Sequence, residues 1–564
     1  MIDLVQSLVR SFHSPTLRLG PYRGKEHSRE KRVQHLVGTS LRLNLARVAG
    51  LFACLALSLL FMPAPASATT YNVVQNCGAV GDGVHDDTTA INTCIGQLNS
   101  DGTSGSDTLL FPCGTYLTTS QLSPITRANV IIDGSSCATV HSIASGGNIL
   151  VIGSSSTGPT VALSTIVYEL SKSFTTASPL GVNLGDYVWI HQGGLDYSTD
   201  TLPGHPTNCD VSGCRGEMLK VASVNGNTVT VTTALHDTYD PTVNGAVVQK
   251  ISSPLAGMTV QNITLNGSGT ENDGLQMLEA VDSTVTGVTA ENILSTALYG
   301  AGDFNLAWNN VTVSGSGNGN GAAMALYVQG NPSVNGASIS NLNPGPVAGA
   351  FGFQISATAG GTFANITVDS TGAYGRPFKT TAARWNTFNS VTAKNGSLND
   401  DNGISIQYYS SHNTFNSCVA TNNGTSGTGT GNAGIITFGN FNQYNIFNNC
   451  TASGNGNIQF YISGFDALRL AQDSGNTVNG GTFTGSNSQE SVMLIEGANT
   501  YIHNATFDGP GTYGIQLDPQ ANYACVNNNT FNPDLGGTIN ATAYHDLGSG
   551  NNPNNGNLTP GTCP

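Results

Sequence analysis

The sequence predicts an all-β protein, a single-stranded right-handed parallel β-helix (solenoid) with an N-terminal capping helix and a small antiparallel β insertion. Three observations predict it. Similar blocks return about every 21 to 34 residues from Asn262 onward, apolar residues recur at strand spacing, and Gly is abundant (70 residues) while only 9% of residues are charged. Blocks of this length that repeat along a chain are typical of solenoids, in which each block packs on the next.

The repeated block contains two short strands. The second strand is clearest in Trp385–Val391 (WNTFNSV), His412–Cys418 (HNTFNSC) and Tyr444–Cys450 (YNIFNNC). Each coil lies about 4.8 Å above the one before, so Phe388, Phe415 and Phe447 are expected to stack inside the solenoid. The Asn residues that follow them are expected to form a structural ladder, because side-chain amides bond to one another and to turn backbone.

The first 68 residues are predicted to be a targeting segment. A basic stretch precedes the apolar run Val48–Met62 and the small-residue site Ala66–Ala68. The run of about 15 residues is shorter than the roughly 20 that a membrane-spanning helix needs, which indicates a cleaved signal. We therefore expect a protein without a membrane span that is secreted, or is located in the periplasm or at the cell surface.

Cysteine usage agrees with an oxidising compartment. Ten of the 11 cysteines follow Cys54, and an even number in an exported chain predicts disulfides. Cys418 and Cys450 occupy equivalent positions in successive coils, where either a disulfide or a pair of stacked thiols is expected. The further pairs that we expect are Cys77–Cys94, Cys113–Cys137, Cys209–Cys214 and Cys525–Cys563.

After the targeting segment, one β-helix domain is predicted over residues 69–545, followed by an Asn, Pro and Gly-rich tail over 546–564. Between residues 179 and 253 the coil pattern is interrupted by a β-rich insertion that includes a hairpin with an Asn225-Gly226 turn. One side of a cleft could be formed there by Trp189, His191, Asp196 and Tyr197, although a Trp in such a strand is more often part of a core.

The N-terminal part carries a distinctive motif. Asn76–Cys94 (NCGAVGDGVHDDTTAINTC) precedes Leu109–Tyr116 (LLFPCGTY). Asp86 or Asp87 is expected to cap a helix that closes the end of the solenoid, with Ile91, Ile95 and Leu98 on its buried face. Together these segments resemble the opening motif of the pectin-lyase-like β-helix superfamily. The resemblance implies the fold, and it implies that Asp82, Asp86 and Asp87 are structural.

The reaction does not follow from this resemblance. Polygalacturonases of the superfamily carry Asn-Thr-Asp, Asp-Asp, Gly-His-Gly and Arg-Ile-Lys motifs, whereas this chain offers only Glu271–Gly274 and Asp400–Asp401, several coils apart. The Arg-x-Pro-x-x-Arg motif of the main pectate lyases and the Asp-Pro-His motif of alginate epimerases are absent too. A polygalacturonase is therefore disfavoured.

A polar strip is expected on the outer face of the first strands, because alternate residues of a strand face opposite sides. In the strand that contains Ile436 and Phe438, these two residues are expected to face inward and Thr437 to face outward, as part of the strip. Hydroxyls, amides and Tyr rings along a solenoid suit a linear sugar chain, although any solvated sheet face is polar. The expected substrate-binding residues are Tyr327, Gln329, Gln354, Gln407, Gln459, Tyr461 and Glu496.

A cluster of cations marks the candidate catalytic centre. Three of the five Lys and Arg residues between Ile251 and Pro564 lie in Arg376–Arg384. A cation that neutralises a uronate, a base of lowered pKa and a Tyr hydroxyl that protonates the leaving oxygen would support β-elimination. The expected catalytic residues are Lys379, Arg376, Arg384 and Tyr409. The competing interpretation is that the cations only balance Asp369, Asp400 and Asp401.

A hydrolase is the first alternative. It needs two carboxyl groups about 5 to 9.5 Å apart, and Asp400 or Asp401 could pair with a carboxylate of another coil. The same two aspartates could instead form a turn or a Ca²⁺ site. The candidate partners are Glu279, Asp303, Asp466, Glu496 and Asp518.

A glycan-binding adhesin or tailspike-like protein without catalysis is the second alternative. After Thr69 the chain carries 10 positive and 31 negative residues, a charge balance that excludes nucleic acid as a natural partner. A polysaccharide is the expected partner in all three cases, and a monomer is the expected state.

Overall fold

The computed structural model describes residues 68–102, 105–192, 215–242, 245–317, 322–342, 350–370, 375–396, 402–424, 432–439, 441–463, 473–486, 491–532, 544–547 and 552–554. The chain divides into two units, Met1–Ala66 and Ser67–Pro564, and all described residues belong to the second. The targeting segment, Asp196, Tyr197 and the Cys209–Cys214 pair therefore lie outside the described residues, apart from Ala68.

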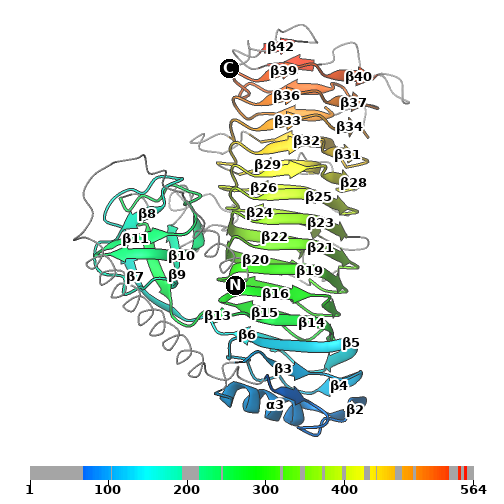
Figure 1. Ribbon diagram of the computed structural model, residues 1–564. Helices are drawn as coiled ribbons and strands as arrows, with labels where there is room; N and C mark the ends of the chain where they lie inside the picture. The colour runs from blue at the N-terminus through cyan, green and yellow to red at the C-terminus, as the bar shows by residue number, and fades with distance from the viewer. Residues whose placement is uncertain are drawn as a thin grey trace, which may run out of the picture. The chain divides into compact units, whose positions relative to one another are not determined.

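The second unit is a parallel solenoid whose coils stack from the N-terminal β2 to β42 (Figure 1). The predicted fold class is confirmed. The first strands of the coils are β6 (Asn148–Gly153), β15 (Asp273–Leu278), β18 (Thr296–Ala301), β20 (Ala322–Gly330), β22 (Ala350–Ala359), β24 (Gly375–Thr381), β26 (Ile404–Gln407), β29 (Ala433–Phe438), β32 (Ile458–Ile462), β35 (Met493–Ile495), β38 (Ile515–Leu517) and β41 (Tyr544–Asp546).

The remaining solenoid strands complete the coils. They are β1 (Thr70–Asn72), β2 (Asp82–Asp86), β3 (Asp107–Leu110), β4 (Gly114–Thr118), β5 (Val130–Ser142), β13 (Leu255–Ala256), β14 (Thr259–Asn266), β16 (Ala280–Thr286), β17 (Thr289–Glu291), β19 (Phe304–Ser314), β21 (Ser333–Ser340), β23 (Thr362–Asp369), β25 (Thr387–Lys394), β27 (Thr414–Asn416), β28 (Val419–Thr421), β30 (Ile446–Asn448), β31 (Thr451–Ser453), β33 (Thr477–Asn479), β34 (Thr482–Thr484), β36 (Tyr501–His503), β37 (Thr506–Asp508), β39 (Cys525–Asn527), β40 (Thr530–Asn532) and β42 (Asn552–Asn554). Because β42 pairs with β39, the last coil extends into the segment predicted as a tail.

The predicted ladders are present. Phe388 stacks on Phe415 with ring centroids 4.4 Å apart, and Phe415 stacks on Phe447 at 5.2 Å. Beside them, Asn416 Nδ2 donates a 2.8 Å hydrogen bond to Asn389 Oδ1 of the coil below. Each ladder repeats one favourable contact coil after coil, so the same residue types recur at the same place in the block.

The cysteines of neighbouring segments are joined as predicted where the structure describes both partners. Disulfides link Cys77 to Cys94, Cys113 to Cys137 and Cys418 to Cys450. Cys525 is also disulfide-bonded, whereas Cys563 lies outside the described residues.

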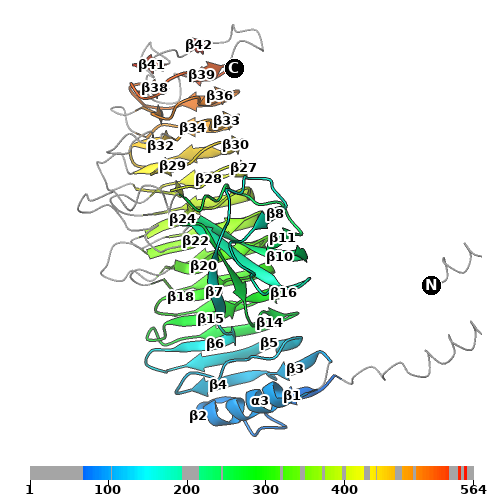
Figure 2. The same ribbon diagram turned by 90° about the vertical axis from the view of Figure 1, so that its left-hand side faces the viewer.

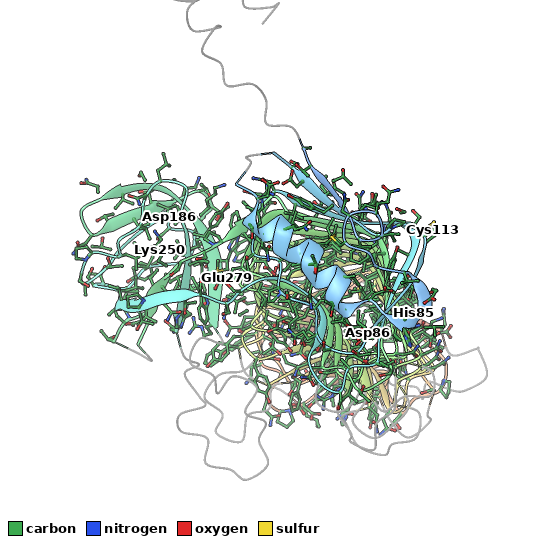
Figure 3. All side chains as sticks on the ribbon, turned by 90° about the horizontal axis from the view of Figure 1, so that it is seen from below. His85, Asp86, Cys113, Asp186, Lys250 and Glu279 are labelled. Atoms are coloured by element: carbon green, nitrogen blue, oxygen red, sulfur yellow. A yellow bond between two sulfur atoms is a disulfide. The ribbon has the colours of Figure 1, made fainter. Side chains whose placement is uncertain are left out.

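Helix α3 (Thr88–Ser100) lies across the N-terminal end of the solenoid (Figure 3). Ile91, Ile95 and Leu98 are fully buried, as predicted. Asp86 accepts hydrogen bonds from the backbone and side chain of Thr88, and Asp87 accepts from the backbone of Val80 and Gly81. The side chains of Asp86 and Asp87 therefore stabilise the segment that leads into helix α3. No helix in the described part of the chain is long and apolar enough to cross a bilayer.

The antiparallel insertion forms a separate six-stranded sheet of order β7-β12-β9-β10-β11-β8 (Figure 2). Its strands are β7 (Thr157–Ala162), β8 (Ser173–Thr175), β9 (Tyr187–Gln192), β10 (Arg215–Asn225), β11 (Thr228–Val231) and β12 (Val247–Ile251). The sheet begins before the predicted residue 179 because β7 pairs with β12. The insertion contacts the solenoid through Tyr187 and Asp282, whose side chains are hydrogen-bonded at 3.0 Å.

One predicted strand orientation is wrong. In β29, Ile435 lies in register with Ile404 and belongs to the solenoid core, while Ile436 packs with Tyr461 on the outer side. Phe438 is 39% exposed, and Thr437 is buried. The run AGIITF contains three apolar residues in four positions, so alternation alone could not fix which of them point inward.

Candidate functional site

The outer faces of the first strands align into one row, which we call the outer row. Its members are in direct register from coil to coil, with neighbouring strands about 4.8 Å apart. They are Gln276, Tyr299, Ala325, Gln354, Lys379, Ser405, Ile436, Tyr461, Leu494 and Gln516. The row is polar from Gln354 to Ser405 and becomes apolar at Ile436, so the predicted strip is only partly polar.

Lys379 lies in the middle of the outer row, between Gln354 of β22 and Ser405 of β26. Its side chain is 2% exposed. It forms no hydrogen bond or ion pair with another described residue, and its ammonium group lies 4.4 Å from the centre of the Phe351 ring. Burial and, to a smaller extent, the positive charge of Arg376 together lower the pKa of Lys379 to about 7. A lysine in this setting is partly neutral at neutral pH and can accept a proton.

Arg376 lies at the start of the same strand and is partly exposed. Its guanidinium carbon is 5.9 Å from the centre of the Phe351 ring, so Arg376 and Lys379 share one aromatic neighbour. Two cations on one ring create a concentrated positive field, which suits an anionic group of a ligand.

Polar side chains surround Lys379 on the outer face. Gln354 Nε2 donates to Ser356 Oγ at 3.3 Å, and Gln407 Nε2 donates to Ser405 Oγ at 2.8 Å. Thr381 Oγ1 and Gln407 Oε1 are buried and have no hydrogen-bond partner in the described part of the chain. Because a buried polar atom without a partner is costly, these two atoms are candidates for contact with a hydroxyl-rich ligand.

Arg384 and Tyr409 are not brought to Lys379. Arg384 is buried beyond the end of β24 and pairs with Asp237 of the insertion at 3.1 Å. Tyr409 is buried too, and the guanidinium of Arg215, another residue of the insertion, lies 5.1 Å from its ring centre. Both residues therefore contact the insertion, and the structure does not bring them together with Lys379 and Arg376.

Two predicted substrate-binding residues are buried in structural hydrogen bonds. Gln329 Nε2 donates to Asp303 at 2.7 Å, because the left-handed backbone of Val328 (φ 54°) breaks the strand alternation just before it. Gln459 accepts a 2.8 Å hydrogen bond from Asn455 Nδ2 and donates to Ser486. Neither side chain is exposed, so both are structural in the described part of the chain, and their binding of substrate stays a prediction.

The remaining predicted binding residues lie at or beside the outer row. Tyr327 packs against Tyr299 with ring centroids 5.6 Å apart, and both rings are partly exposed. Burial raises the pKa of both Tyr299 and Tyr327. Further along, the Tyr461 hydroxyl donates to Glu496 at 2.8 Å. The outer row therefore has a partly exposed aromatic pair on one side of Lys379 and the buried Tyr461 on the other.

The hydrolase and calcium hypotheses depend on residues outside the described part of the chain, since Asp400, Asp401 and Asp466 are not described. Of the other candidates, Asp303 is fully buried, and burial raises its pKa well above the usual value. Glu279 is also buried and accepts from the backbone and hydroxyl of Ser156. In the described residues no three His, Cys, Asp or Glu side chains cluster as a metal site would require.

Sequence reasoning missed two aromatic features. The first is Phe351, whose ring lies near both Arg376 and Lys379. It lies at the start of a strand, where no pattern indicates to which side of the sheet a side chain points. The second feature was visible as the first letter of each repeated block: Trp385, His412 and Tyr444 stack at the corner before β25, β27 and β30, with centroid distances of 4.6 and 5.0 Å.

Comparison with known proteins agrees with this architecture. A family model described as "Rhamnogalacturonase A/epimerase, pectate lyase-like" matches residues 70–323. The chain is therefore similar to this pectate-lyase-like family over that part of its sequence, and its fold is a parallel β-helix. No curated protein sequence matches significantly.

Several solved structures share this pectin-lyase-like fold. The tailspike protein gp49 from Pseudomonas phage LKA1 is 16% identical and has a TM-score of 0.52, with 82% of this chain and 81% of that chain covered. The A-module of the mannuronan C-5 epimerase AlgE6 from Azotobacter vinelandii is 12% identical (TM-score 0.44, coverage 86% and 100%). An exopolygalacturonase from Thermotoga maritima is 9% identical (TM-score 0.37, coverage 83% and 93%). At such identities the likeness concerns the fold alone.

Proposed function

We propose that this protein is a secreted enzyme that binds an extracellular polysaccharide containing uronic acid and cleaves it by β-elimination, with Lys379 as the base. The observation that carries the proposal is the position of Lys379: a buried lysine without a described carboxylate partner, in the middle of a polar row on the outer face of a solenoid. The disulfides support an extracellular location. The matching family model, described as "Rhamnogalacturonase A/epimerase, pectate lyase-like", supports a carbohydrate substrate.

The reaction is assigned to the residues as follows. Arg376 binds the C6 carboxylate of the uronate and so acidifies the C5–H bond. The neutral amine of Lys379 takes the C5 proton, the electron pair forms the C4–C5 double bond, and the C4–O4 bond breaks. The departing oxygen takes a proton from the Lys379 ammonium group, either directly or through a water molecule that donates one proton and receives another from Lys379, and this restores the neutral base.

The division of labour between the two cations follows from their environments. An arginine keeps its proton at any physiological pH, so Arg376 can serve only as a fixed positive charge. Lys379 has the lowered pKa that a base requires, because its burial disfavours the charged form. Gln354 and Ser405, its neighbours in the outer row, are placed to bond sugar hydroxyls on either side.

Product chemistry tests the reaction. The purified protein is incubated with polygalacturonate, alginate, rhamnogalacturonan and glucuronan, and both the absorbance of unsaturated uronides and new reducing ends are measured. Unsaturated products are expected. Reducing ends without that absorbance would show a hydrolase, and retention of a polysaccharide without either signal would show a binding protein; both outcomes would overturn the proposal.

Variants of one residue then test the assignment. Lys379→Met and Lys379→Arg are both expected to lower kcat at least 1000-fold, on the order of the contribution of a general base. Lys394→Met is the matched control, because Lys394 lies on β25 in a partly exposed pair with Asp369. Full activity of Lys379→Met would remove Lys379 from the mechanism.

A further inference from the structure

One corner of the solenoid holds its residues in a left-handed backbone conformation over ten successive coils. The corner follows the first strand of each coil, and equivalent positions are aligned by backbone pairing. Its residues, with φ between 49° and 69°, are Asp282, Asn305, Asn331, Gly360, Trp385, His412, Tyr444, Gly475, Asn499 and Tyr523. Asn, Asp and Gly adopt this conformation readily, so most coils have the residue that the backbone favours.

Four coils depart from this rule: three adjacent coils, with Trp385, His412 and Tyr444, and one later coil, with Tyr523. Trp385 and Tyr444 are bulky residues in a conformation that costs them conformational energy, and His412 lies between them. Stability alone would favour Asn here, as at Asn331 and Asn499. A strained residue that a fold retains in place of an easier one points to a function outside folding.

The three rings form a short, partly exposed stack. Trp385 and His412 are nearly parallel, with an interplanar angle of 3° and centroids 4.6 Å apart, and Tyr444 continues the stack at 5.0 Å. Trp385 is 38% exposed and Tyr444 51% exposed. Glu169 of the insertion fixes one end, because it accepts a 2.5 Å hydrogen bond from Trp385 Nε1. The aromatic surface is therefore pre-organised.

A pocket of about 460 Å³ runs beside the stack. The pocket is also lined by a row of outward side chains two residues further along each coil, Thr387, Thr414, Ile446 and Thr477. The described residues that line the pocket include no Lys or Arg, and desolvation lowers the pKa of His412. Aromatic rings and threonine hydroxyls in one pocket, without a cation among its described lining residues, suit an uncharged ring that has an apolar C–H face and hydroxyls at its edge.

We propose that the Trp385–His412–Tyr444 stack and the threonine row form a second saccharide-binding site, which takes neutral sugar units of a polysaccharide away from the outer row. The proposal goes beyond the proposed catalysis and depends on it only for the class of polymer. The pocket spans four coils, or about 14 Å along the solenoid. It can thus hold a side branch or a neutral stretch of a chain whose charged units occupy the Lys379 site.

Binding measurements with intact protein test the proposal. Neutral oligosaccharides (galacto-, manno- and cello-oligomers) and oligogalacturonate are titrated by calorimetry and by Trp fluorescence. The chain has three Trp residues, and Trp308 is fully buried, so the fluorescence change is expected to vanish in Trp385→Phe. At least one neutral series is expected to bind, with the affinity falling at least tenfold in Trp385→Asn and in Tyr444→Asn.

The fold supplies a matched control. Tyr523 occupies the same corner, is 62% exposed and does not line the pocket, so Tyr523→Asn is expected to bind like the wild type. Because Asn suits the corner, both pocket variants are expected to melt at or above the wild-type temperature. Unchanged affinity in both, or lower melting temperatures as for a core residue, would overturn the proposal.

The remaining outcomes separate this site from catalysis and from self-association. Lys379→Met is expected to keep neutral-sugar binding, and Trp385→Asn is expected to keep full activity on short oligouronates. If the lyase reaction fails while neutral binding persists, only the proposed function falls. A dimer in gel filtration that Trp385→Asn dissociates would assign the pocket to a second copy of the chain and overturn the proposal.

Discussion

The ammonium group of Lys379 lies 4.4 Å from the centre of the Phe351 ring and faces no described carboxylate. The ring face attracts the cation, which offsets part of the cost of burying it. The offset is incomplete, because the pKa of Lys379 still falls from 10.5 to about 7. The aromatic ring therefore favours the protonated form of Lys379, whereas burial and the charge of Arg376 favour the neutral form.

The acid limb of the pH profile is the first prediction. The neutral form of Lys379 increases as the pH rises through about 7, so kcat/KM is expected to rise about tenfold per pH unit below 7 and to level off above it. Phe351→Leu removes the attraction for the cation and should move this limb to lower pH, by about half a unit. Arg376→Gln removes a like charge and should move it to higher pH. A limb that stays fixed in both variants would contradict the assignment of the base.

The buried charges between the insertion and the solenoid give the second prediction. Asp237 pairs with Arg384 at 3.1 Å and with Arg215 at 2.7 Å. Asp237→Asn leaves two buried guanidinium groups without their counter-charge, and a loss of about 3–5 kcal/mol in the free energy of unfolding is expected. Arg384→Met leaves the pair with Arg215 intact and should cost less. Thermal unfolding of both variants checks the order, and equal losses would show that Asp237 does not join the two cations.

The fold could be predicted from the sequence because each of its ladders repeats. Equivalent residues of successive blocks have similar neighbours in the chain and lie above one another in space. The spacing of the blocks therefore predicts that Phe388, Phe415 and Phe447 stack, as they do. The N-terminal motif likewise predicted helix α3, and helical periodicity predicted which face of this helix is buried.

The site was predictable only in part. The register that places Lys379 between Gln354 and Ser405 follows from counting alternate positions along the blocks. Arg384 and Tyr409 are covered by the insertion, whose docking depends on contacts between residues about 150 or more positions apart in the chain, such as Arg384 with Asp237. Gln329 turned inward because of a single left-handed residue, and no periodic pattern shows where such a residue occurs.

The disulfide within the solenoid gives the third prediction. Cys418 and Cys450 join adjacent coils and are 32 positions apart in the chain. Replacing both by Ser removes a closed loop of this length, and a loss of about 3–4 kcal/mol is expected from the entropy of the unfolded chain. Thermal unfolding with and without a reductant measures it: the reductant should lower the melting temperature of the wild type more than that of the double variant. An equal effect on both proteins would show that this bond contributes nothing.

A buried carboxyl group in an Asn ladder gives the last prediction. Asp473 accepts hydrogen bonds from Asn442 N and Nδ2 at 2.9 and 3.1 Å, as Asn476 Oδ1 accepts from Asn445 at 3.0 and 3.1 Å. Burial raises the pKa of Asp473 from 3.8 to about 8, against the opposing hydrogen bonds from Asn442. Between these two values the folded protein holds a proton that the unfolded chain has released, so the free energy of unfolding falls as the pH rises from about 4 to 8.

Asp473→Asn removes this titration while keeping the ladder. The variant is expected to be more stable than the wild type at pH 9, on the order of a few kcal/mol, with the difference shrinking toward pH 4. Asn476→Asp is the converse test, because it places a carboxyl group at the equivalent point of the neighbouring ladder and should weaken the fold mainly at alkaline pH. Denaturant unfolding across this pH range checks both variants, and a stability difference that does not change with pH would mean that Asp473 keeps its charge in the folded protein.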